Sequence, residues 1–238
     1  MKPNKILSFL TLTISIIKFN FRIIFANRFI WFMLGSVAFY IILSLNIVLT
    51  ESTMRIEDMY GILLFSGILI VFYPTVFGIQ NDQDARTIEI LFGIPNYRYK
   101  VWLVRSLMIF LLAFLMVIFY ASLSSYLIVR FNIFDMASQV MFPILFLGTM
   151  AFMLSTLIRN GNGTAVTMIV FGLLFMILAD PLEKSRWNVF LNPFAVPNNV
   201  SDIAWQSISF DNRIFMSTGI ILFLLYALFN LQKREKFM

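Results

Sequence analysis

At 238 residues, with 60% hydrophobic and 13% charged side chains, the chain is far too apolar for a soluble protein, whose charged fraction is roughly twice as large. It contains no cysteine and no histidine, which excludes disulfides, thiolate chemistry and metal sites built from these residues. The formal net charge of +6 does not indicate nucleic-acid binding, because the lysines and arginines flank apolar runs and form no basic face. We therefore predict an integral membrane protein.

Residues 1–28 resemble a signal peptide at first sight. A basic start precedes the apolar run 6–17, but no small-residue cleavage site follows it. Polar residues recur instead at intervals of 3 or 4 and draw one narrow polar stripe: Ser8, Thr11, Ser15, Lys18 and Arg22. We predict an amphipathic helix in the membrane interface, anchored to lipid headgroups by Lys18 and Arg22. The alternative is an uncleaved, signal-like anchor with no further role.

Six charge-free runs of 19 to 24 residues follow, and a bilayer core about 30 Å thick needs about 20 helical residues. These runs predict an all-α membrane domain over 29–238. Its six transmembrane helices are expected at about 29–50, 59–81, 101–129, 136–158, 162–180 and 214–232.

The basic residues predict the orientation of these spans. With the N-terminus inside, thirteen lysines and arginines lie in cytoplasmic segments and five in outer ones. By the positive-inside rule, both termini are cytoplasmic. We expect a multi-pass protein of the plasma membrane, which is the inner membrane in a bacterium.

The longest outer segment, 181–213, contains an apolar island at 187–194 that is too short to span. Three prolines accompany the island: Pro181, Pro193 and Pro197. This pattern suits a re-entrant or interfacial pair of short helices, although a plain structured loop fits equally well. On the other side, 159–163 is predicted to be a tight turn.

The main cytoplasmic loop, 80–105, contains the pattern of a short helix at 82–92. Asn81 or Asp82 is a natural N-cap, and Gly93 followed by Pro95 ends the helix. An apolar face is formed by Ala85, Ile88, Leu91 and Phe92, and a polar face by Asp82, Arg86 and Glu89. A helix this short is marginal alone, so it needs a docking partner.

The chain offers little for catalysis or for harvesting energy inside the membrane. Asp82-x-Asp84 could be read as a metal pair, but acids at a helix start are the commoner reason for this spacing, and we predict no metal site. No glycine precedes a lysine, so the chain lacks a phosphate-binding P-loop and does not hydrolyse ATP alone. The charge-free runs that form the six predicted spans have no ionisable residue in their interiors, and Asp180 stands at a span end, which argues against a transporter driven by an ion gradient. Energy for active transport would then enter from a partner, through the helix at 82–92.

Hydroxyl and amide side chains inside the spans are predicted to serve helix packing more often than substrate contact. They are Ser36, Ser44, Asn46, Thr75, Ser122, Ser125, Thr149, Ser155, Thr167, Ser217 and Thr218.

The first cytoplasmic loop, with the six spans and the N-terminal helix, resembles the type-two export permeases of the ATP-binding-cassette (ABC) superfamily. In that family the loop runs acid, then Gly or Arg, Thr, an aliphatic residue, Glu, a leucine pair and Pro. Thr87, Glu89, Leu91 and Pro95 match this order, whereas Phe92 replaces the common second leucine. Arg86 stands where Gly is frequent, and 192–194 (Asn-Pro-Phe) resembles the family's outer loop.

The resemblance implies that 82–92 is a coupling helix docked in a groove of a separate ABC ATPase subunit, which carries the ATP and Mg. The residues expected to contact that subunit are Asp84, Ala85, Arg86, Thr87, Ile88, Glu89, Leu91 and Phe92. The resemblance further implies a second permease copy or a related permease, forming a homodimer or heterodimer. It also implies export, with outer re-entrant helices closing the exit.

Three other functions remain open from the sequence. A membrane scaffold or sensor worked by an ABC ATPase would share the loop but move no substrate. A secondary transporter or channel would work without ATP. An intramembrane enzyme is the least favoured, because the reactive groups are so few.

Overall fold

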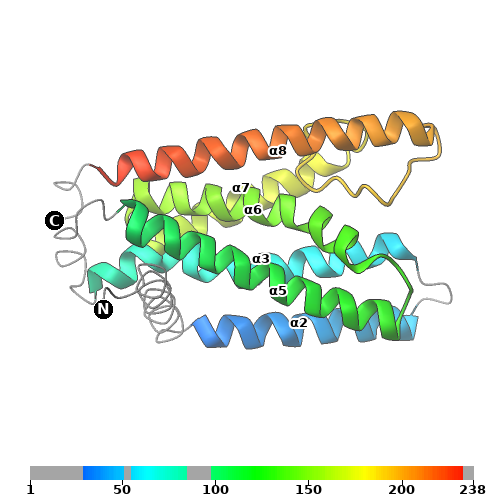
Figure 1. The fold of residues 1–238 in the computed structure, drawn as a ribbon, viewed down its shortest axis with the longest axis horizontal. Helices are drawn as coiled ribbons and strands as arrows, with labels where there is room; N and C mark the ends of the chain where they lie inside the picture. Colours follow the sequence, from blue (N-terminus) through cyan, green and yellow to red (C-terminus); the bar gives the residue numbers. More distant parts are fainter. Residues whose placement is uncertain (1–28, 51–54, 85–97, 233–238) are drawn as a thin grey trace, which may run out of the picture.

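The computed structural model describes residues 29–50, 55–84 and 98–232, and every regular element in these ranges is a helix (Figure 1). In chain order they are α2 (Phe29–Thr50), α3 (Ile56–Asp84), the π-helix η1 (Arg98–Leu103), α5 (Val104–Leu127), α6 (Ile133–Ile158), α7 (Gly161–Ala179) and α8 (Asp202–Asn230).

Within the described ranges, six stretches of helix are long and apolar enough to cross a membrane, which agrees with the predicted number of spans. α2 has the predicted bounds, while α3 and α6 begin three residues earlier than predicted. η1 and α5 together form the third span, over Val101–Leu127. The predicted N-terminal interfacial helix, including Lys18 and Arg22, lies outside the described residues.

The helices lie side by side as a bundle, and consecutive spans run in opposite directions (Figure 1). We call the end where α2 begins and α8 ends the coupling end, and the opposite end, which holds the 180–201 connection, the loop end. α3 and α6 form the centre, because α3 contacts α2, α5, α6 and α7, while α6 contacts α3, α5, α7 and α8. α2 and α7 lie on the outside and bury little of their surface.

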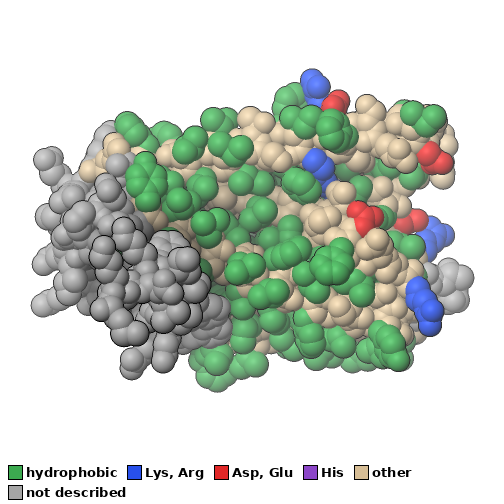
Figure 2. All heavy atoms as spheres, in the orientation of Figure 1, with side chains coloured by type: hydrophobic (Ala, Val, Ile, Leu, Met, Phe, Trp, Pro, Cys, Tyr) green, Lys and Arg blue, Asp and Glu red, His purple; other side chains and the backbone are tan. Residues whose placement is uncertain are grey.

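The exposed surface of the bundle is apolar over its middle. Figure 2 shows hydrophobic side chains along the helices, while the charged side chains visible on this face lie toward the loop end. Large apolar residues such as Leu49, Ile177 and Leu222 are more than half exposed. A soluble protein rarely exposes a contiguous apolar surface of this extent, whereas hydrocarbon solvates it well.

Asparagine and serine side chains begin three of the helices. Asn132 accepts from the backbone N–H groups of Phe134 and Asp135 at the start of α6. Asn160 caps α7 and Ser201 caps α8 in the same way. The connection between α6 and α7 consists of Arg159, in the left-handed region at φ 59°, and Asn160, so it is even tighter than the predicted turn.

A small polar cluster attaches α2 to the bundle. Ser36 Oγ donates to the Ser66 carbonyl at 2.7 Å and lies 3.1 Å from Tyr120 Oη. Tyr40 Oη lies 2.9 Å from Ser124 Oγ, and its ring stacks on that of Tyr120. Because lipid solvates apolar surface as well as protein does, these hydrogen bonds specify where α2 packs.

Replacing Ser36 with alanine is expected to lower the free energy of unfolding by about 1 kcal/mol, the size typical of hydrogen bonds between membrane helices. Ser44→Ala is the matched control, because the buried Ser44 Oγ on the same helix has no hydrogen-bond partner. Its loss is expected to be neutral or slightly stabilising. Unfolding in mixed micelles by a denaturing detergent measures both, and equal effects of the two changes would contradict the assignment.

The other hydroxyls of the spans are mostly used inside the bundle. Ser155 Oγ donates across to the Val76 carbonyl of α3 at 3.0 Å. Several donate to carbonyls three or four residues earlier in their own helix: Thr75, Ser122, Thr149, Thr167 and Thr218. Hydroxyls engaged in this way agree with the predicted packing role.

The outer connection differs from the predicted pair of short helices. Residues 181–201 form a succession of turns without helix, and 202–213 belong to α8. Val189 and Leu191 are buried, and Asn192 Nδ2 donates to the Glu57 carbonyl at the start of α3. Asn212 Nδ2 donates to the Arg186 and Asn188 carbonyls, which holds the turns against α8. The segment is therefore the structured loop that the sequence had left as the alternative.

Candidate functional site at the coupling end

The predicted ATPase-contacting residues fall almost entirely on a segment outside the described residues. Of the eight, Asp84 alone is described, as the exposed last residue of α3. Gln80 Nε2 donates to Asp84 Oδ2 at 3.5 Å, one turn back along the same helix. Ala85, Arg86, Thr87, Ile88, Glu89, Leu91 and Phe92 lie in the range 85–97, which the structure does not describe.

The predicted start of the coupling helix is wrong. Asn81 and Asp82 were expected to cap a new helix, but α3 continues through both of them to Asp84. An N-cap has non-helical backbone, so neither residue can serve as one inside a continuous helix. The Asp82 side chain is only 6% exposed, because it turns into the bundle rather than toward water.

Asp82 forms a buried ion pair with Arg105 in the first turn of α5. Asp82 Oδ2 lies 2.7 Å from Arg105 Nη1, and both side chains are more than nine-tenths buried. The Arg105 guanidinium also lies over the Trp102 ring, 4.8 Å from its centroid. Arg105 Nε and Nη2 have no hydrogen-bond partner, so the carboxylate is the principal neutralising contact of this cation.

The ion pair joins the end of α3 to the start of α5, on either side of the connection between spans two and three. Asp82 precedes the segment 85–97 and Arg105 follows it, so the two ends of the segment are fixed to one another. The sequence analysis placed Asp82 on the polar face of the predicted helix with Arg86, whereas the structure pairs it with Arg105. One feature of the sequence could have indicated this pair: Asp82 and Arg105 carry opposite charges and stand at the two boundaries of the same loop, next to apolar runs.

Polar contacts at the same end join α7 to α3 and α8 to α6. The Gly161 N–H of α7 donates to Gln80 Oε1, and a Cβ at Gly161 would collide with the Phe77 ring. Asn230 Nδ2 of α8 donates to the Thr156 carbonyl of α6 at 2.7 Å. Because close-packed interiors transmit strain, a displacement of the last turn of α3 would reach α5 and α7 directly.

Apolar packing completes this end of the bundle. Trp102 of η1 is 2% exposed, stacks against Phe152 of α6 and belongs to a cluster with Ala227, Leu228 and Leu231 at the end of α8. The π-helical turn places Trp102 and Arg105 on the bundle side of the chain as it re-enters the membrane span. Short π-helical turns are frequent at functional sites.

The described residues at this end offer no catalytic or metal-binding arrangement. Within the described ranges, no group of three or more acidic side chains could hold a metal ion. Asp82 is buried in an ion pair and Asp84 is exposed, so the two carboxylates of Asp82-x-Asp84 do not converge on one point. The described polar side chains at this end instead join helices to one another.

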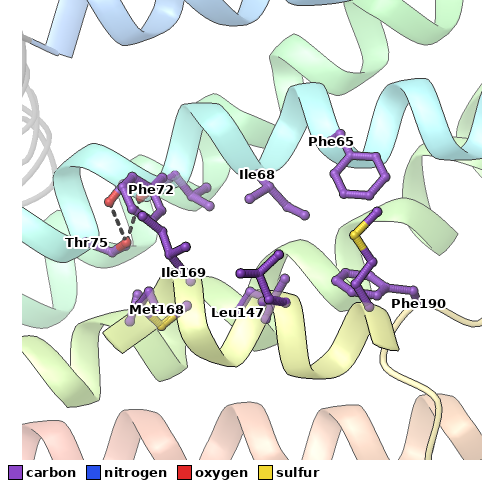
Figure 3. A pocket seen from close by; sticks show the side chains of 14 residues that line it. Phe65, Ile68, Phe72, Thr75, Leu147, Met168, Ile169 and Phe190 are labelled. Atoms are coloured by element: carbon purple, nitrogen blue, oxygen red, sulfur yellow. Dashed lines mark hydrogen bonds between the residues drawn. The ribbon is translucent and has the colours of Figure 1, made fainter. Parts of the chain in front are cut away.

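An apolar cavity of about 230 Å³ lies between α3, α6 and α7 (Figure 3). Figure 3 shows Phe65 and Phe72 of α3, Leu147 of α6 and Met168 of α7 around it. Thr75 is the one hydroxyl in the lining, and it donates to the carbonyls of its own helix. The cavity therefore suits an aliphatic chain and has no free polar group to orient a polar cargo.

Comparisons of the chain with protein-family models, with curated proteins and with solved structures find no match in any of the three. The fold itself defines the class. Six apolar helices of spanning length, packed as one bundle with an apolar outer surface, are the architecture of a multi-pass helical membrane protein.

Proposed function

We propose that this chain is the membrane subunit of an ATP-driven exporter of the ABC superfamily. A separate ATPase subunit binds the coupling segment, residues 84–92, and a second permease copy or a related permease completes the transport path. Both termini and the coupling segment face the cytoplasm. The observation that carries the proposal is the Asp82–Arg105 ion pair, which ties both ends of the loop to the bundle and makes the loop a suitable lever.

The proposed mechanism follows from this arrangement. When two ATPase subunits close on ATP, they displace the docked segment, and the fixed ends carry this displacement into α3 and α5. The contacts of Gln80 with Gly161 and of Ser155 with Val76 extend it to α6 and α7. The chain needs no nucleotide site of its own, because binding energy released on the partner drives the conformational change.

The coupling segment is tested with the double variant Ile88→Asp/Glu89→Lys. On the proposal, Ile88 packs in the ATPase groove and Glu89 lies at its rim, so an apolar anchor and a charge are both lost. We expect the purified complex to lose most of its transport-coupled ATP hydrolysis, by about tenfold or more, while the chain remains folded and inserted.

Glu183→Lys is the matched control, since it makes the same charge change on an exposed residue at the loop end. Co-purification of a nucleotide-hydrolysing subunit, hydrolysis by that complex and thermal unfolding of the chain are measured together. Undiminished hydrolysis and export by the double variant would refute the coupling role. Flux driven by an ion gradient without any ATPase would instead favour a secondary transporter.

A further inference from the structure

The structure places a positive charge inside a helix that the sequence had left charge-free. The last span was predicted to begin at residue 214, with Arg213 in the outer loop, but α8 begins at Asp202. Arg213 therefore lies in the interior of α8, and it is 7% exposed. The helix therefore begins twelve residues before the predicted start of the last span.

Neutral groups surround the Arg213 guanidinium. Its Nε donates to Gln139 Oε1 of α6 at 2.8 Å, and its Nη1 donates to Asn212 Oδ1 at 3.0 Å. Nη1 also lies 3.7 Å from Met216 Sδ, and Nη2 lies 3.5 Å from Tyr60 Oη, at the limit of a hydrogen bond. Among the described residues, no carboxylate lies within ion-pair distance of this arginine. A buried charge without a counter-charge is costly, so an anion that reached this arginine would be bound favourably.

A cavity of about 320 Å³ opens onto this arginine between α6, α8 and the outer loop. Ser209, one turn before Arg213 on α8, also lines the cavity, and its buried Oγ has no hydrogen-bond partner. A guanidinium has five N–H donors, and the contacts above leave one Nη2 hydrogen without an acceptor. Arg213 and Ser209 therefore line one cavity, and each has a donor hydrogen left that is suited to the oxygens of an anion.

The depth of the cavity indicates which anion reaches it. Seventeen residues separate Arg213 from Asn230 at the other end of α8, a distance of about 26 Å along the helix. The hydrocarbon core of a bilayer is about 30 Å thick. A core that begins near Asn230 would therefore end near Arg213 and Ser209, close to the level of the lipid phosphates. The walls include Trp205 and Phe194, whose rings suit this interfacial level.

We propose that this cavity binds the phosphate of a lipid or lipid-linked molecule in the leaflet at the loop end. Arg213 Nη2 and Ser209 Oγ donate to the phosphate oxygens, and Gln139 holds the guanidinium in position. Asp135, one turn before Gln139 on α6, lines the same cavity and repels the phosphate. The site does not depend on an ATPase partner.

The test compares phosphatidylglycerol with diacylglycerol of the same acyl chains, added to the delipidated full chain in neutral detergent and followed by native mass spectrometry. We expect phosphatidylglycerol to bind at least about tenfold more tightly. Arg213→Gln should abolish this preference and Ser209→Ala should weaken it several-fold. Asp135→Asn should strengthen it, an increase that damage to the fold would not produce. Arg130→Gln, an exposed arginine at the same end, is the matched control and should change little.

A parallel titration with inorganic phosphate separates a lipid from a free solute. Binding of phosphatidylglycerol that millimolar phosphate does not displace supports a lipid ligand, whereas displacement that requires Arg213 supports a phosphate site open to soluble molecules. Equal binding of the two lipids by the wild-type chain would overturn the proposal. The proposal would also be overturned if Arg213→Gln and Arg130→Gln lowered the affinity for phosphatidylglycerol equally and Asp135→Asn did not raise it.

Discussion

Replacing Asp82 with asparagine is expected to lower the free energy of unfolding by about 3 kcal/mol, which is a large effect for one isosteric change. The amide keeps the shape of the carboxylate but removes its charge, so Arg105 is left buried without a counter-ion. Its Nε and Nη2 already lack hydrogen-bond partners, and the Trp102 ring gives only partial compensation. Removing one member of a buried pair costs more than the pair itself contributes, because the remaining charge stays desolvated.

The double variant Asp82→Asn/Arg105→Gln tests this reason directly. It removes both charges, so we expect it to be more stable than Asp82→Asn alone, by about 1 kcal/mol or more. Asp84→Asn is the matched control, because it makes the same change on an exposed residue two positions later and should cost under about 0.5 kcal/mol. Thermal unfolding in detergent measures these three variants and the single variant Arg105→Gln. Additive single effects in the double variant would show that the two side chains do not stabilise each other.

The same variants connect stability to the proposed function. If the loop works as a lever, the double variant should insert and fold but transmit the motion of the loop poorly, because its ends are no longer fixed to one another. ATP hydrolysis by the complex would then proceed with reduced export. A permease that keeps wild-type export in the double variant would show that the ion pair serves the fold alone.

The ends of the spans show which structural information is local in the sequence and which is not. A charge-free run predicts a helix inside hydrocarbon, because lipid tolerates few charges and requires internal backbone hydrogen bonds. This reasoning located all six helices. It fails where a helix continues past the first charged residue. The predicted end of α3 and the predicted start of α8 are both wrong for this reason. Asp82 stays helical because Arg105, 23 residues later, neutralises it. α8 extends back to Asp202 because Gln139 and Tyr60, on other helices, accept from Arg213.

The candidate sites differ in how far local patterns could reveal them. The prediction for the loop at 82–92 used only short-range patterns, namely its caps, its two faces and its order of residues, and the structure shows that the predicted N-cap is wrong. The cavity at Arg213 depends on residues from α6, α8 and the outer loop, and no local pattern brings these together. The predicted short helices at 187–194 failed for a related reason: the turns there are held by Asn212 of α8 and by the start of α3.

The contact between Gly219 of α8 and Phe146 of α6 gives the other large expected change in the free energy of unfolding. A Cβ on Gly219 would overlap the Phe146 ring, with Cδ2 at 3.0 Å and a second ring carbon closer still. This ring cannot swing aside freely, because it packs against Phe175, Phe215 and Phe223. We expect Gly219→Ala to lower the free energy of unfolding by about 1–3 kcal/mol, although alanine is the better helix former.

Two further variants separate this steric cause from a general effect of the substitution. Gly35→Ala, at an exposed helical position with open space around it, should raise the free energy of unfolding by up to about 1 kcal/mol. Adding Phe146→Leu to Gly219→Ala should recover part of the loss, because the smaller side chain leaves room for the new methyl group. Unfolding in mixed micelles measures each change. A Gly219→Ala variant as stable as the wild-type chain would mean that α6 and α8 separate readily at this point. A transport cycle that moves α8 against α6 would then not have to break a tight contact.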